Sequence, residues 1–414
     1  MKFLHAADIH LDSPMQGVSR RTDAPVEALR DCTRRALTGL VDLAIEEDVA
    51  CLIIAGDLYD GDWKDYGTGV YFAREMRRLG ERPVYVVLGN HDAASTITKG
   101  LKLSLPANVH LFPTRGCETV DLPALGLAIH GRSFAERHVT EDMSAGFAPP
   151  LAGRLNIGVL HTSCENLEHE RYAPCTAAGL AARGYQYWAL GHVHERAELS
   201  ETPRIVFPGN LQGRNPRETG IKGASLVHVE DGAIARVEHR AVDVLRWAAV
   251  PVDLDGADGA AALRERAAAA LATAATAAED RLLAARVTLA GETPLHPRLL
   301  ADAAWLDAEL RQVAPDGVWI ERVRLRTAAP RRAPGEDALS TLLAAFDDAL
   351  DEPALVAEME KELNALVDRL PHGAEAAELR DLVTGAGLAA LAAEARALVS
   401  HRLAGDAAED DATA

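Results

Sequence analysis

Residues 50–60, ACLIIAGDLYD, join a run of apolar side chains to two carboxylates. A short apolar run bounded by glycine is typical of a buried β-strand. Asp57 would therefore follow the carboxyl end of a strand, at the edge of an open α/β sheet where ligands commonly bind. The alternative interpretation, that Asp57 caps the next helix, is disfavoured by similar residues elsewhere in the chain.

Four further predicted strands also end in residues with oxygen or imidazole side chains. A lone histidine in such a place is more often a core or capping residue, but packing does not require five successive strand ends to carry such side chains. Mixed oxygen and imidazole ligands without a thiolate suit manganese, iron or zinc better than calcium. The residues are Asp8 and His10, then Asn90, His91 and Asp92, then His161, and finally His192 and His194.

Short apolar runs alternate with helical segments from Met1 to about Val242. Residues 25–47 and 66–79 carry apolar side chains at spacings of three and four, as amphipathic helices do. Residues 224–229 and 234–239 resemble a hairpin around a turn. This alternation predicts a layered α/β fold. The other predicted strands are residues 2–7, 50–55, 83–88, 125–130, 155–160, 187–190 and 204–208.

A chain of 414 residues exceeds the usual size of one hydrophobic core, so several domains are expected. We assign residues 1–243 to a first domain. Residues 244–327 show a shorter cycle of strands and helices, which predicts a second, small α/β domain. Its expected elements are strands near 248–254, 286–290 and 318–325, with one helix ending near 278 and another at 299–313.

A linker rich in proline and arginine is expected at residues 328–338, followed by a helical segment at 339–404. Several leucines of that segment fall on one helical face. The helices could pack on their own protein or bind a partner, and both interpretations stay open. Residues 405–414 are small and acidic, which predicts a disordered tail.

The net charge of -19 argues against a protein that coats nucleic acid by bulk electrostatics, because that mode needs a basic surface. It does not exclude a nuclease. Divalent metals and a few arginines can hold a phosphate, and a carboxylate-rich site itself adds negative charge.

The five cysteines are odd in number and have no C-x-x-C spacing, so neither a disulfide framework nor a thiolate zinc site is expected. A reducing cytoplasm fits this pattern. Cys164 and Cys175 flank a loop near the predicted site, and a structural role is favoured for both. The amino terminus does not resemble a signal peptide, and no apolar run reaches the about eighteen residues of a membrane helix.

The motifs D-x-H, G-D-x-x-D, G-N-H-D/E, H and G-H-x-H occur in this order over residues 1–194. In this respect the chain resembles the calcineurin-like metallophosphoesterase superfamily, which implies a β-sandwich flanked by helices. The opening MKFLHAADIHLDSP and the loops at 172–175 and 209–215 are similar to SbcD-type DNA repair exonucleases, in particular their shorter YhaO-like bacterial relatives. In that subgroup a small α/β capping domain and a helical segment follow the catalytic domain.

The resemblance implies two metal ions that share one carboxylate. Such ions lie roughly 3.5–4 Å apart, so that one phosphodiester can engage both. It also implies that His91 donates a proton to the leaving oxygen or stabilises the transition state, with Asp92 orienting its ring. Asp60, which is histidine in some relatives, is given a secondary role. One implied ligand set is Asp8, His10, Asp57 and His194, and the other is Asp57, Asn90, His161 and His192.

Other charged residues carry weaker signals. Arg214 and Arg217 could contact a nucleic-acid backbone or could be ordinary solvated loop charges. His169, in the loop after His161, is left undecided. Ordinary structural or surface roles are expected for His5, His110, His130 and His138.

Three functions follow from these observations. The favoured one is a manganese-dependent DNA exonuclease in DNA repair or end processing, with iron or zinc as alternative metals. Its expected partners are DNA and a coiled-coil ATPase of the SbcC or SMC type bound through the C-terminal helices, and the chain could pair as a homodimer. The second is a phosphodiesterase for a nucleotide or small molecule, which the net charge of -19 favours. The third is a non-catalytic scaffold for the ATPase, but no expected metal ligand is missing.

Overall fold

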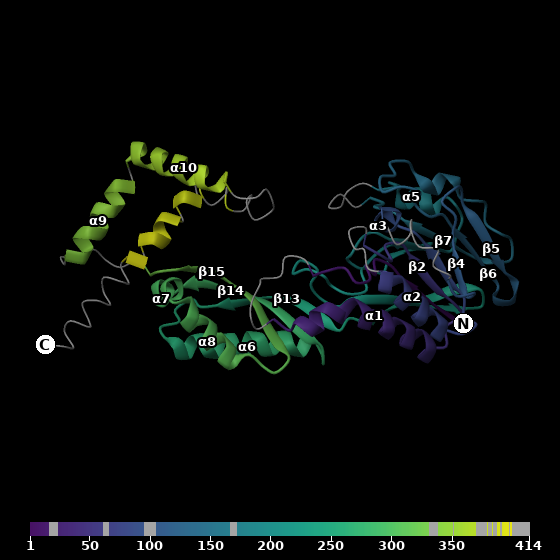
Figure 1. Cartoon of the computed structure of the whole chain (residues 1–414), viewed down its shortest axis with the longest axis horizontal. Helices are drawn as coiled ribbons and strands as arrows, with labels where there is room; N and C mark the ends of the chain where they lie inside the picture. The colour runs from purple at the N-terminus through teal and green to yellow at the C-terminus, as the bar shows by residue number, and fades with distance from the viewer. Residues whose placement is uncertain are drawn as a thin grey trace. The chain divides into compact units, whose positions relative to one another are not determined.

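The computed structural model describes residues 1–15, 24–60, 66–94, 105–165, 172–330, 338–350 and 352–369, with a few helical residues between 379 and 399. The chain divides into two compact units (Figure 1). The first contains Met1–Ala249 with Ala275–Ala285 and Gly317–Glu321. The second contains Val250–Ala274, Arg286–Asp316 and Arg322–Ala414.

Two six-stranded sheets form the framework of the first unit. The first sheet has the order β12-β11-β1-β2-β3-β4 and the second has the order β5-β6-β7-β8-β10-β9. Strands β1 to β4 pair in parallel, as do β6, β7, β8 and β10. The first sheet contains β1 (Lys2–Ala6), β2 (Leu52–Ala55), β3 (Val84–Val87), β4 (Val109–Leu111), β11 (Gly223–Glu230) and β12 (Ala233–Ala241). The second contains β5 (Glu118–Leu122), β6 (Leu127–Gly131), β7 (Leu155–His161), β8 (Tyr187–Gly191), β9 (Ala197–Glu201) and β10 (Arg204–Phe207).

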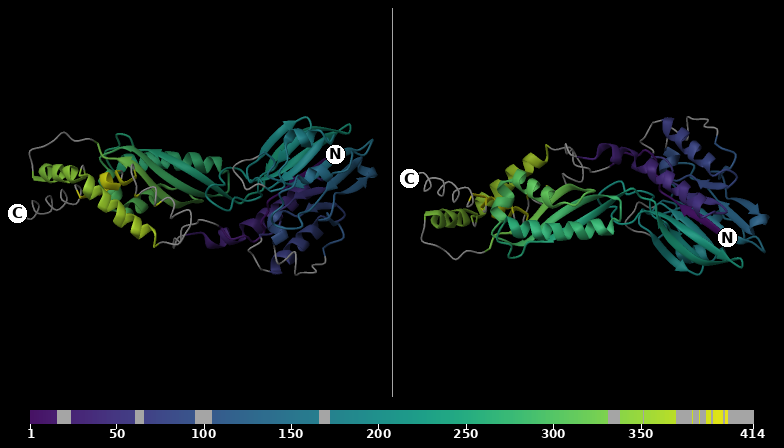
Figure 2. Two further views of the ribbon diagram at one scale, coloured as in Figure 1. Left: turned by 90° about the horizontal axis from the view of Figure 1, so that it is seen from above. Right: turned by 90° about the horizontal axis from the view of Figure 1, so that it is seen from below.

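The two faces of β1 bury different neighbours, because successive side chains of a strand point in opposite directions. Phe3 packs in a core shared with residues of the second sheet, such as Ile129. Leu4 packs instead with Leu40 of α1 (Val26–Glu46) and Phe72 of α2 (Tyr66–Arg78). Helices α1 and α2 therefore cover the outer face of the first sheet, while the second sheet covers its inner face (Figure 2). The prediction of a layered α/β fold is confirmed.

Three strands were not predicted from the sequence, and all three lie at sheet edges. Strands β5 and β9 are the outer strands of the second sheet, and β4 is an outer strand of the first. Their side chains are mostly half-buried or exposed. An edge strand needs no continuous apolar run, because one of its sides faces water. The strands expected from apolar runs in the first domain are all present.

A three-stranded sheet follows, with the order β13-β14-β15. The single helix expected at 299–313 is instead two helices, α7 (His296–Ala301) and α8 (Ala303–Val313). The break falls at Asp302, whose carboxylate accepts a hydrogen bond from the backbone N–H of Trp305 at 2.8 Å and so caps α8. The strands are β13 (Leu245–Asp253), β14 (Leu282–Glu292) and β15 (Val318–Ala328), and α6 (Ala260–Ala277) connects the first two.

Two helices, α9 (Ala338–Leu350) and α10 (Pro353–Val367), lie in the segment expected to be helical. Most of the expected linker at 328–338 and the whole tail at 405–414 lie outside the described residues. A further short helix, α5 (Ala177–Ala181), precedes β8 in the first unit. Among the residues that the structure describes, no helix is both long and apolar enough to cross a bilayer.

Candidate metal centre

The carboxyl ends of five strands bring the predicted metal ligands together. Parallel strands of one sheet end at the same edge, and here the edges of the two facing sheets meet. Six of the seven side chains are buried, and His194 is partly exposed. His161 is the last residue of β7, and the others follow β1 (Asp8, His10), β2 (Asp57), β3 (Asn90) and β8 (His192, His194).

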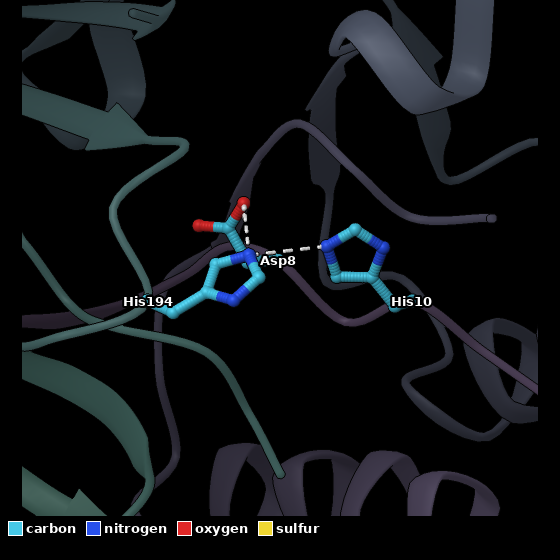
Figure 3. Close-up of side chains that lie close together, drawn as sticks. All are labelled: Asp8, His10 and His194. Carbon is cyan, nitrogen blue, oxygen red and sulfur yellow. Dashed lines mark hydrogen bonds and ion pairs between the residues drawn. The ribbon is translucent and has the colours of Figure 1, made fainter. Parts of the chain in front are cut away.

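Asp8, His10 and His194 form a first group, in which one ligand atom of each residue lies within 4.8 Å of the others. Nε2 of His10 is 3.3 Å from Nε2 of His194, and Oδ1 of Asp8 is 3.9 Å from the same nitrogen (Figure 3). The two ring nitrogens and the carboxylate therefore converge on one point. A divalent cation placed there would accept lone pairs from all three residues.

Asp57, His161 and His192 form a second group of the same kind, also within 4.8 Å. Nε2 of His161 is 3.4 Å from Oδ2 of Asp57 and 3.0 Å from Oδ1 of Asn90. The same Oδ2 atom of Asp57 is 3.7 Å from Nε2 of His10 in the first group. Asp57 thus lies between the two groups, where its carboxylate could contribute to both.

Hydrogen bonds on the far side of two histidine rings leave their Nε2 atoms available to a metal. Nδ1 of His161 is 2.9 Å from the carbonyl oxygen of Ala55. A carbonyl only accepts, so Nδ1 of His161 carries the hydrogen. Nδ1 of His194 is likewise 2.8 Å from Oε1 of Glu218. Such outer contacts orient histidine ligands in metal sites. Glu218 was not anticipated from the sequence.

The carboxylates near His161 favour a positive charge within the cluster. Burial alone would lower the pKa of His161, but the neighbouring carboxylates of Asp57 and Asp8 outweigh it and raise this pKa to about 9. In the metal-free protein a proton on Nε2 therefore takes the place of a positive ion between these carboxylates. A metal must displace that proton, so binding is expected to strengthen as pH rises.

Four of these residues have strained backbones. The φ angles are 51° at Asp8, 43° at His10, 51° at Asp57 and 104° at His192. Residues other than glycine rarely adopt positive φ, and such conformations persist only where the surrounding structure holds them. The chain therefore leaves the regular strand geometry at the points where these side chains turn toward the cluster.

The glycines that precede the motif residues are required by close packing. A Cβ atom on Gly89 would lie 2.2 Å from Oδ1 of Asp57. A Cβ atom on Gly191 would lie 1.9 Å from the carbonyl oxygen of Ala55. No side chain fits at either position, so glycine allows the strand ends to approach closely enough to form the cluster.

His91 lies beside the first group and is paired with Asp60. Its Nδ1 is 3.2 Å from Oδ1 of Asp60, and its ring meets the ring of His10 edge to face at 4.9 Å. Burial alone would lower the pKa of His91, but the hydrogen bond to Asp60 and the charges of Asp57 and Asp60 outweigh it and raise this pKa. A protonated His91 is thus favoured next to the proposed ligands.

The expectation that Asp92 orients His91 does not agree with the structure. The carboxylate of Asp92 accepts backbone N–H groups of Leu58 at 3.1 Å, Tyr59 at 2.7 Å and Gly89 at 2.9 Å. His91 and Asp92 are consecutive on the short helix α3 (Asn90–Ala94), and consecutive helical side chains do not face each other. Asp92 therefore holds the loop after β2, and Asp60 takes the place beside His91.

The two arginines of the loop before β11 occupy different environments. Arg214 is only 6% exposed, and its Nη1 donates to Oγ of Ser13 at 2.7 Å and to Oδ2 of Asp60 at 3.2 Å. It is a buried partner of Asp60, and the interpretation as a solvated charge is wrong for it. Arg217 is exposed, as a contact for a polyanion would need to be.

The other histidines considered in the sequence lie outside the two groups or outside the described residues. His5 contacts the hydroxyl of Tyr187 and the carbonyl of Leu190 in the core. His130 contacts Asn156 at 3.0 Å. His110 pairs with Glu118 and His138 stacks on Tyr172, whereas His169 falls outside the part of the chain that the structure describes.

Two segments of the chain match known family models. Residues 1–196 match the family model of the calcineurin-like phosphoesterases. Residues 247–328 match the model of the middle domain of metallophosphoesterase YhaO. The resemblance inferred from the five motifs is confirmed.

Three individual proteins similar to the chain are a metallophosphoesterase, a DNA repair protein and a nuclease subunit. The chain is 35% identical over 270 residues to the uncharacterized metallophosphoesterase YhaO of Bacillus subtilis, covering 64% of this chain and 65% of YhaO. It is 25% identical over 296 residues to the DNA double-strand break repair protein Mre11 of Methanopyrus kandleri, covering 64% and 62% of the two chains. It is 26% identical over 159 residues to one of the subunits of the nuclease SbcCD of Bacillus subtilis, covering 36% and 38%. The match thus spans less than two thirds of each relative.

Proposed function

We propose that the chain is a metal-dependent phosphodiesterase that holds two divalent cations in the cluster. Asp8, His10 and His194 would hold one cation, and His161 and His192, with Asn90, the other. The observation that carries this proposal is the position of Asp57, whose Oδ2 is 3.7 Å from Nε2 of His10 and 3.4 Å from Nε2 of His161. One carboxylate oxygen between two sets of imidazoles is suited to bridge a pair of metals.

The residues of the chain have distinct tasks in such a reaction. Two bound cations supply Lewis-acid polarisation of the phosphate and a more acidic water. The bridging carboxylate and the histidines hold the reacting groups at a fixed spacing. His91, held at Nδ1 by Asp60, donates a proton from its other ring nitrogen to the leaving oxygen. The hydrogen bond to Asp60 and the charges of Asp57 and Asp60 raise the pKa of His91 and so favour the protonated ring.

We propose DNA as the substrate, cleaved from an end during repair or end processing with manganese as the metal. The similarity to proteins named for DNA double-strand break repair and to a nuclease subunit supports this choice. Exposed Arg217 would contact the phosphate backbone. The helices α9 and α10 would bind a coiled-coil ATPase, and the chain could form a homodimer.

A small phosphodiester is the second candidate substrate. The net charge of -19 disfavours binding to a long polyanion unless metals and a few arginines compensate for it. The scaffold alternative has less support, because all seven expected ligands are present and clustered.

The test is Mn²⁺-dependent cleavage of end-labelled single- and double-stranded DNA, compared with hydrolysis of a chromogenic phosphodiester. Wild type is compared with Asp57→Ala and His91→Ala, and with His110→Ala as a control that removes a histidine outside the cluster. Loss of DNA cleavage in Asp57→Ala and His91→Ala, with wild-type cleavage in His110→Ala, would support the nuclease function. Activity on the chromogenic ester without DNA cleavage would favour a small substrate. No activity from metal-loaded wild type, with or without the ATPase, would contradict the enzyme.

A further inference from the structure

The loop between β10 and β11 carries a carboxylate with three hydrogen-bond partners. Oε1 of Glu218 faces Nδ1 of His194 at 2.8 Å. Oε2 of Glu218 accepts from the side-chain amide of Asn210 at 2.9 Å and from the backbone N–H of Arg214 at 2.6 Å. The two oxygens therefore have separate tasks, one toward the metal cluster and one toward the loop itself.

We propose that Glu218 is a positioning residue that fixes the tautomer and orientation of the His194 ring for the first cation. This inference rests on the two-cation function proposed above. An ionised carboxylate can only accept hydrogen bonds, so Nδ1 of His194 must carry the hydrogen. Nε2 of His194 then presents its lone pair toward Asp8 and His10.

The same loop also holds the backbone of His194. The carbonyl oxygen of His194 accepts from the N–H of Asn210 at 3.2 Å and from Nζ of Lys222 at 2.9 Å. A Cβ atom on Gly209 would lie 3.1 Å from this oxygen, so the two segments are in close contact. Residues 209–222 thus hold both the backbone carbonyl and the ring of His194. Glu218 is therefore part of a set of contacts that fixes this residue.

Glu218 affects the two proposed cation sites unequally. In the second group, Nδ1 of His161 is held by the carbonyl oxygen of Ala55 on β2, which is independent of the loop. Loss of Glu218 should therefore weaken the first site and spare the second. A general structural role in closing the loop would not predict a change in the tautomer of one histidine.

Glu218→Gln tests this with little change in shape. Two donors, the Asn210 amide and the Arg214 N–H, both require the amide oxygen of the new glutamine. Its NH₂ group must then face Nδ1 of His194 as a donor, which forces the hydrogen of His194 onto Nε2. That hydrogen would occupy the position where the first cation binds. The matched control is Glu195→Gln, which removes an exposed carboxylate one residue from His194.

The experiment uses the full chain. The imidazole ¹⁵N shifts of His194, assigned with His194→Gln, report its tautomer in the metal-free protein, and Mn²⁺ titration reports the affinity of each site. We expect the Nδ1–H tautomer in wild type and in Glu195→Gln, and the Nε2–H tautomer in Glu218→Gln. We also expect Glu218→Gln to weaken one Mn²⁺ site by about 10- to 100-fold and to leave the other unchanged.

The outcomes separate this inference from the proposed function. If Glu218→Gln keeps the wild-type tautomer and both wild-type Mn²⁺ affinities, Glu218 is not a positioning residue. If both sites weaken together, its role is a general structural one and the inference is overturned. If wild type itself binds fewer than two Mn²⁺ ions, the two-cation function fails, while the tautomer still reports on Glu218 because it is measured without metal.

Discussion

Oδ1 of Asp60 lies 3.2 Å from Nδ1 of His91, and its other oxygen accepts from Ser13 at 2.7 Å and from Arg214 at 3.2 Å. The carboxylate is therefore held on one side and is directed at the imidazole on the other. Such a partly buried pair favours the protonated ring and fixes which ring nitrogen faces the carboxylate. This relationship supports the proposed role of His91 as a proton donor.

Asp60→Asn is expected to lower kcat while leaving KM for a phosphodiester nearly unchanged. The variant keeps the shape of the side chain but removes the charge that stabilises protonated His91. A positioned acid contributes about 10²–10⁴-fold to a rate, and most of that factor should be lost. Steady-state kinetics in saturating Mn²⁺ measure the fall in kcat. The control is Asp121→Asn, which changes an exposed aspartate. A wild-type kcat in Asp60→Asn would show that Asp60 does not support the acid.

Adding Mn²⁺ to the metal-free protein should raise its thermal stability in a concentration-dependent way. The cluster holds buried Asp8 and Asp57 beside the four histidines of the two groups, and a cation would relieve the repulsion between these carboxylates. Each site adds about 2.7 kcal/mol to the free energy of unfolding when free Mn²⁺ is 100 times its Kd. Thermal melts with and without a chelator measure the effect. An unchanged Tm at millimolar Mn²⁺ would contradict a metal site here.

Gly89→Ala should abolish Mn²⁺ binding, because its Cβ would lie 2.2 Å from Oδ1 of Asp57 and would displace the proposed bridging carboxylate. Gly259→Ala is the matched control, since nothing lies within 4 Å of the added atom there. The control should bind Mn²⁺ with the affinity of wild type. Isothermal titration with Mn²⁺ compares the two variants. Equal Mn²⁺ binding in both would show that the site does not require a glycine at position 89.

Arg217→Ala should weaken DNA binding about equally for all sequences and leave hydrolysis of a small chromogenic ester unchanged. Arg217 is exposed, so removing it costs no buried contact. If it contacts one phosphate, the slope of log K against log salt should become shallower by about 1. Binding measured in metal-loaded, cleavage-deficient His91→Ala at several salt concentrations tests this. An unchanged slope would place the DNA elsewhere.

The identity of the cluster residues could be predicted from the sequence because each follows an apolar run. A strand and the residue at its end are local features, and parallel strands bring their carboxyl ends to one edge. Asp8, Asp57 and His161 are far apart in the chain, yet each is recognisable at its own strand. The layered α/β fold followed from the same alternation. Edge strands such as β5 and β9 did not, because they are not covered on both sides.

The partners of these residues depended on contacts across the fold. The partner of His91 is Asp60 and not the expected Asp92, because consecutive side chains on a helix point in different directions. The sequence did not predict that residues 90–94 form a helix. Glu218 meets His194 from 24 residues away, and Arg214 reaches Asp60 from 154 residues away. A carboxylate or guanidinium in a loop looks the same in a sequence whether it is solvated or buried. Its partner is chosen only when the loops pack against one another.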